Sequence, residues 1–78
     1  MEFVRRLGST PQERGSLSNT TCPDIFELTT GDFAIIGTDA TASLEGKLPP
    51  GAARANYESI VVITRETLLA AKRDIPDF

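Results

Sequence analysis

Two apolar runs between residues 24 and 37 predict a β-hairpin. Ile25 to Leu28 and Phe33 to Ile36 are rich in strand-forming residues, and the short segment between them contains a glycine. We expect a two-residue turn at Thr30-Gly31, although a longer loop that includes Asp32 also fits the sequence. Because side chains alternate along a strand, the two-residue turn places one apolar set on a common face: Phe26, Leu28, Phe33 and Ile35.

The C-terminal part of the chain predicts a strand followed by a helix. Residues 60–63 are apolar at every position, so we expect them to form a third strand of the same sheet, buried on both faces. Thr64 is a suitable N-cap for a helix from about Arg65 to Arg73, and Pro76 ends it. The sequence therefore predicts an α+β fold: a small three-stranded, mostly antiparallel sheet with one C-terminal helix on one face.

Residues 1–21 are predicted to form a flexible N-terminal arm ahead of a single small α+β domain over residues 22–78. From residue 8 onward the arm has Leu17 as its only large aliphatic side chain, too little apolar surface to offset the entropy of ordering. Three apolar residues near its start have helix-like spacing: Phe3, Val4 and Leu7. This run is too short for an independent helix, so we expect it to dock on the domain or on a partner.

Residues 38–59 fit two structures, a continuation of the second hairpin strand or a short helix capped by Asp39. Oxygen-bearing side chains alternate here as they do in calcium-binding loops: Asp39, Thr41, Ser43 and Glu45. Leu44 stands where such a loop has its glycine, and Pro50 stands where it ends in glutamate. Because these two positions depart from the calcium-loop pattern, we expect no bound metal. The alternating oxygens still make a small-ligand or metal-binding module that uses residues 39–45 the alternative function.

Size and composition narrow the classes of function. The chain has 78 residues, 40% of them hydrophobic, and a formal net charge of -3. So short a chain has a marginal core, which favours association with another chain. The net negative charge disfavours binding to the negatively charged phosphate backbone of nucleic acids. No apolar run approaches the roughly 18 residues that a membrane span needs. We expect a cytoplasmic protein whose partner is another protein or a second copy, with no direct contact to nucleic acid or membrane.

Cys22 is the obvious candidate for a reactive side chain. A catalytic thiolate needs a base or a cation beside it, and the chain contains no histidine. We therefore expect that the chain is not an enzyme, and that Cys22 is a small apolar residue at the start of the hairpin. We expect no cofactor.

The second face of the predicted hairpin is the candidate partner-binding site. In the expected register this face carries four residues: Ile25, Glu27, Ala34 and Ile36. If the helix covers the Phe26/Phe33 face, an apolar patch around one charge is left uncovered, as in protein interfaces. The N-terminal apolar residues, or those of residues 40–44, could instead fold back over it. We therefore predict a non-enzymatic protein-interaction module that forms a homodimer or binds a regulator through this face.

From residue 22 onward, a cysteine opens a hairpin with a glycine turn, and a strand, a linker, a second strand and a helix with an acidic tail follow. The corresponding positions are Cys22, Gly31, Phe33 to Asp39, Ile60 to Ile63, Thr64-Arg65-Glu66 and Asp74 to Phe78. This pattern resembles a group of short actinobacterial proteins typified by the sporulation regulator BldB. The resemblance implies a small regulatory partner that acts beside a helix-turn-helix transcription regulator and self-associates, and it implies no catalytic residues.

Overall fold

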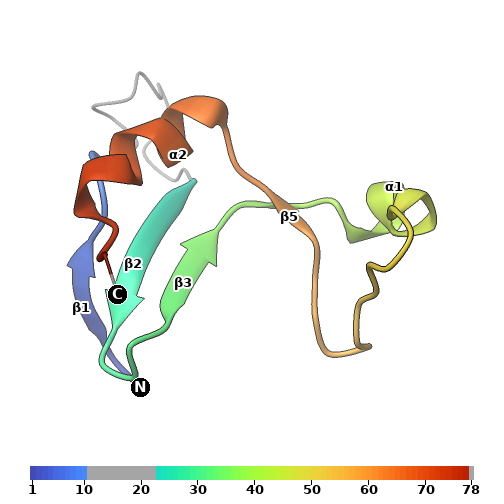
Figure 1. Cartoon of the computed structure of the whole chain (residues 1–78), viewed down its shortest axis with the longest axis horizontal. Helices are drawn as coiled ribbons and strands as arrows, with labels where there is room; N and C mark the ends of the chain where they lie inside the picture. The colour runs from blue at the N-terminus through green and yellow to red at the C-terminus, as the bar shows by residue number, and fades with distance from the viewer. Residues whose placement is uncertain (11–22, 78) are drawn as a thin grey trace.

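The computed structural model describes residues 1–10 and 23–77. In chain order, its elements are β1 (Phe3–Arg6), β2 (Asp24–Leu28), β3 (Phe33–Ile36), β4 (Thr38–Asp39), α1 (Thr41–Leu44), the 3-10 turn η1 (Glu45–Lys47), β5 (Val61–Val62), α2 (Arg65–Ala71) and the 3-10 turn η2 (Lys72–Asp74). Figure 1 shows two parts, which we call the body (β1, β2, β3, α2 and η2) and the lobe (residues 38–62). The α+β class with a C-terminal helix is confirmed.

The third strand of the main sheet comes from the N-terminal end of the chain. The strand order is β1-β2-β3, and both pairs of neighbours are antiparallel. We expected residues 60–63 to supply this strand, but β5 pairs with β4 in a separate two-stranded ribbon. The three-stranded sheet is therefore confirmed, whereas the expected identity of its third strand was wrong.

Strand β1 lies within the residues that we expected to form a flexible arm. The backbone N–H of Leu7 donates to the carbonyl of Ile25 at 2.9 Å, and the Leu7 side chain is buried. A bulge between Phe3 and Arg5 interrupts the strand alternation, and the apolar residues do not share one face: Phe3 contacts the ring of Phe26, whereas Leu7 packs in the core. The arm prediction was therefore wrong for the start of the chain, and residues 11–21 lie outside the described residues.

The hairpin is present, but its register differs by one residue from the expected one. The N–H of Leu28 donates to the carbonyl of Asp32 at 2.9 Å, so the loop is Thr29–Gly31. Gly31 has a φ of 91°, the left-handed conformation that ends such loops and that glycine adopts without strain. The observed pairs are Asp24 with Ile36, Ile25 with Ile35, Phe26 with Ala34, and Glu27 with Phe33. Because a shift of one residue exchanges the faces, the expected layer containing both Phe26 and Phe33 was wrong.

Helix α2 packs on one face of the sheet through a small apolar core. Leu7, Ile25 and Ala71 are its buried members, and Ile63 packs against them. Gly8 permits the close approach of the chain to the helix: its φ is 82°, and a Cβ there would lie 2.8 Å from the backbone of α2. Burial at this contact joins the two ends of the chain.

The expected N-cap of the C-terminal helix is confirmed. The side-chain oxygen of Thr64 accepts a hydrogen bond from the backbone N–H of Thr67 at 3.2 Å. The same two side chains share a hydrogen bond of 2.7 Å between their hydroxyls, which pairs the buried hydroxyl of Thr67. The cap therefore fixes the start of α2 where the chain returns from the lobe to the body.

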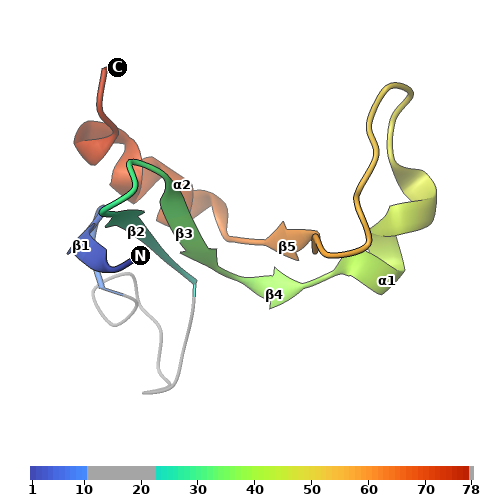
Figure 2. The same ribbon diagram turned by 90° about the horizontal axis from the view of Figure 1, so that it is seen from below.

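The lobe contains both a short strand and a short helix, the two structures that the sequence allowed for residues 38–59. The N-cap of the helix is Ala40 and no side chain caps it, so the expected cap at Asp39 was wrong. Strand β4 follows β3 after one residue, and α1 follows β4 after one more. None of residues 38–62 is buried, and Figure 2 shows the lobe projecting from the C-terminal end of β3. Polar interactions rather than an apolar core must therefore hold its shape.

Candidate interaction site

The residues predicted to form one interaction face lie on two opposite faces of the sheet. Ile25 and Glu27 are on the side of α2, where Ile25 is 6% exposed and belongs to the core. Ala34 and Ile36 are on the other face, and Ile36 is 50% exposed. The cause is the register shift described above. The prediction that these four residues form a single surface was therefore wrong.

An apolar groove lies between α2 and β3 instead. Its rim is formed by two residues of β3 and two from the C-terminal part of the chain: Phe33, Ile35, Leu68 and Ile75. Leu7, Ile25 and Ala71 also line this space, which has a volume of about 220 Å³. Phe33 is 41% exposed and Ile35 is 48% exposed, because α2 lies over β2 and leaves β3 partly uncovered. This surface is open and apolar.

The groove continues toward the hairpin loop. A second hollow of about 520 Å³ shares Phe33 and Ile75 with it and reaches Glu27. The carboxylate of Glu27 accepts a hydrogen bond from Nε of Arg5 at 2.7 Å. Arg5 also donates to the carbonyl of Asp74 at 2.7 Å. The carboxylate at this end of the groove is thus already paired within the chain.

Strand β3 is an edge strand of the sheet, so one side of its backbone faces away from β2. Hydrogen-bonded and non-hydrogen-bonded pairs alternate in an antiparallel ladder. Leu28 and Asp32 form a hydrogen-bonded pair, so the pairs that Phe33 and Ile35 make with residues of β2 are non-hydrogen-bonded. The N–H and C=O groups of Phe33 and Ile35 therefore point outward. The contact from Leu7 to the carbonyl of Ile25 supports this pattern, because that carbonyl points toward β1.

The opposite face of the sheet is covered in part by its own side chains. The rings of Phe3 and Phe26 meet edge to face with centroids 4.9 Å apart, and the guanidinium of Arg6 lies 5.2 Å from the Phe26 centroid. Arg6 also donates to both oxygens of the buried Asp24, at 3.0 and 3.1 Å. This face thus combines aromatic and charged contacts, whereas the groove on the other face is lined by apolar side chains.

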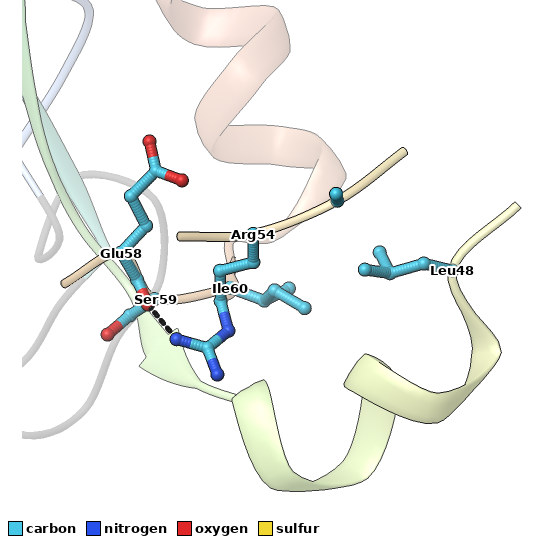
Figure 3. A pocket seen from close by; sticks show the side chains of 6 residues that line it. Leu48, Arg54, Glu58, Ser59 and Ile60 are labelled. Atoms are coloured by element: carbon cyan, nitrogen blue, oxygen red, sulfur yellow. Dashed lines mark hydrogen bonds between the residues drawn. The ribbon is translucent and has the colours of Figure 1, made fainter. Parts of the chain in front are cut away.

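A third hollow, of about 410 Å³, lies in the lobe, and Figure 3 shows the side chains around it, among them Arg54, Glu58 and Ile60. The guanidinium of Arg54 donates to the carboxylate of Glu45 and to the carbonyls of Ala55 and Glu58, the last at 2.6 Å. Because the guanidinium of Arg54 is already hydrogen-bonded to these acceptors within the chain, it is not available to bind an anion in the hollow. Arg54 instead ties η1 to the segment before β5.

Three of the four oxygen-bearing side chains in residues 39–45 are also used within the chain: Asp39, Thr41 and Glu45. Asp39 Oδ1 accepts hydrogen bonds from the N–H and the hydroxyl of Thr41, at 3.0 and 2.7 Å, and Glu45 pairs with Arg54. In the described ranges, no three His, Cys, Asp or Glu side chains come together as a group that could hold a metal ion. Cys22 lies outside the described residues.

Comparison with known proteins finds no matching family model, no matching curated protein and no matching solved structure. The resemblance to the BldB group therefore stays a prediction. Within residues 1–10 and 23–77, no helix has the length and apolar character needed to cross a membrane.

Proposed function

We propose that this chain is a non-enzymatic protein-interaction module that self-associates through the groove between α2 and β3. The observation that carries the proposal is the partly exposed apolar rim of the groove beside an outward-facing strand edge. Apolar surface of this kind marks protein interfaces in soluble proteins. The resemblance to the BldB group supports a regulatory role for such a dimer in the cytoplasm, beside a transcription regulator.

A second copy is the occupant that the composition of the body favours. Among the described residues, the buried apolar side chains are Leu7, Ile25, Leu28 and Ala71. So small a core leaves the isolated chain marginal, and association is one way in which small domains complete their cores. A second copy is present wherever the chain folds, and its groove is lined by the same apolar side chains as the first. The net charge of -3 likewise favours a protein partner over a phosphate backbone.

Sedimentation equilibrium with two neighbouring variants tests the proposal. Ile35 and Ile36 are the same residue type with almost the same exposure, 48% and 50%, but they lie on opposite faces of β3. We expect a dimer at micromolar concentration for the unmodified chain. Ile35→Asp should raise the dimer dissociation constant at least about tenfold, equivalent to about 1.4 kcal/mol. Ile36→Thr is the control on the opposite face, because it removes exposed apolar surface without adding a charge to the strand, and it should leave the dimer intact.

A second pair of variants on α2 keeps the test valid if Ile35→Asp fails to fold by circular dichroism. Leu68 lines the groove, whereas Leu69 is similarly exposed and does not line it. We expect Leu68→Asp to weaken the dimer and Leu69→Asp to preserve it. A monomer for the unmodified chain up to millimolar concentration would overturn the proposal. So would loss of the dimer in Ile36→Thr alone, because that result places the interface on the other face.

A further inference from the structure

We infer that two copies of this chain join by antiparallel pairing of their β3 strands about a two-fold axis at Ala34. This inference rests on the proposed self-association and specifies its geometry. The two three-stranded sheets would become one continuous sheet, with both α2 helices on the same face. The argument comes from the backbone groups of β3, from its side chains and from the direction in which the lobe leaves it.

The backbone determines the register. Phe33 and Ile35 carry the outward-pointing N–H and C=O groups of β3, as the pairing with β2 requires. A two-fold axis at Ala34 places Phe33 of each copy opposite Ile35 of the other. Both outward-facing residues then enter hydrogen-bonded pairs. An axis at Phe33 would pair Phe33 with its own copy but set Ile35 opposite a residue outside β3, and an axis at Ile35 would do the same to Phe33. The axis at Ala34 is therefore the one that gives both residues a hydrogen-bonding partner within β3.

The side chains fit the same axis. Phe33 and Ile35 both face the groove, so this register brings each of them against its counterpart and joins the two grooves into one apolar floor between the helices. On the other face, the residue at the axis is Ala34, whose small side chain allows two copies to approach closely.

The outer edge of β3 also lacks the residues that protect an exposed strand from pairing with another chain. Natural proteins guard exposed edge strands with lysine, proline or inward-pointing charges. Strand β3, Phe-Ala-Ile-Ile, has none of these. Figure 2 shows that the chain leaves the C-terminal end of β3 toward the lobe. Because paired β3 strands run in opposite directions, the two lobes would lie at opposite ends of the joined sheet.

Disulfide cross-linking at the axis tests this geometry. The two Ala34 residues would form a non-hydrogen-bonded pair with Cα atoms about 4.5 Å apart. That separation falls within the range of about 4.4–6.8 Å that a disulfide spans. In a Cys22→Ser background, we expect Ala34→Cys to form a covalent dimer in nearly every molecule when oxidised glutathione is added. The control is Ala42→Cys, an exposed position on α1 in the lobe, which should stay largely monomeric on a non-reducing gel.

Amide hydrogen exchange without any substitution provides an independent measurement. Only the dimer should protect the outward N–H groups of Phe33 and Ile35, so their exchange should slow at least about tenfold as the chain concentration passes the dissociation constant. The N–H groups of Ala34 and Ile36 point toward β2 and should change much less. A dimer with neither the cross-link nor this protection would overturn the strand pairing while the proposed function stands. A monomer at every concentration would overturn both.

Discussion

The body and the lobe hold their shapes by different interactions. In the body, Leu7, Ile25 and Ala71 come from distant parts of the sequence and are buried together. In the lobe, residues 38–62 bury no side chain, and Arg54 and Thr41 connect its segments by hydrogen bonds. Apolar burial couples every element that contributes to it, whereas exposed polar contacts act locally. We therefore expect the body to unfold as one unit and the lobe to open separately, at a lower free energy.

The largest effect that should separate the two parts comes from adding a methyl group to a glycine in each. In the body, Gly8→Ala forces a residue with a Cβ into a φ of 82° and places that Cβ 2.8 Å from the backbone of α2. Strain and overpacking together should lower the free energy of unfolding by about 2–5 kcal/mol. In the lobe, a Cβ at Gly46 meets nothing within 4 Å, so Gly46→Ala should change it by less than about 0.5 kcal/mol.

Urea denaturation followed by circular dichroism, at one fixed chain concentration, measures both variants. Fixing the concentration matters because dimerisation itself stabilises the folded chain. Equal midpoints for Gly8→Ala and Gly46→Ala would show that the approach of Gly8 to α2 contributes nothing to stability, and the contrast between body and lobe would fail.

A smaller and purely local effect is expected from Arg54→Ala. Arg54 bonds to Glu45 and to the carbonyls of Ala55 and Glu58, and its positive charge strengthens these hydrogen bonds relative to neutral ones. Its loss should speed amide exchange across residues 45–60 at least about tenfold and leave the urea midpoint of the body unchanged. Lys47→Ala removes a charge from the same lobe and serves as the control. A fall in the midpoint of the body would mean that the two parts unfold together.

The same contrast explains which parts of the fold could be predicted from the sequence. The hairpin and the N-cap at Thr64 were predicted because their signals are local: strand-rich runs around a glycine, and a capping residue before a helical run. The register failed by one residue, because a three-residue loop ending at Gly31 competes closely with the expected turn at Thr30-Gly31. Packing of Ile25 under α2 fits the observed register, and that contact is not local.

The third strand and the candidate site were mispredicted for a related reason. The apolar run at residues 60–63 indicates a strand but not its partner, and in the structure Val61 and Val62 are 40% and 47% exposed in a two-stranded ribbon. The four residues of the predicted site were chosen from the expected hairpin register. Because that register was wrong by one residue, they lie on two opposite faces of the sheet. One signal for the groove was present in the sequence: Phe33 to Ile36 contains no charge to guard an edge.

The smallest predicted effect is a pH dependence confined to the start of the lobe. The pKa of Asp39 lies below its ordinary value of 3.8, mainly because its carboxylate accepts hydrogen bonds from the backbone N–H and then the hydroxyl of Thr41, with a smaller contribution from the charge of Arg54. A lowered pKa means that the carboxylate favours the folded lobe above pH 3.8, and that this contribution disappears as the pH falls through the lower, folded value. The amide resonance of Thr41 should therefore titrate with a midpoint below 3.8, while resonances in the core of the body do not follow it. Asp39→Asn should abolish the step at Thr41, because an amide oxygen can still accept the bond but has no proton to gain in this range. A Thr41 midpoint at or above 3.8 would contradict this account, since the bonds to Asp39 would then give the charged form no advantage in the folded lobe.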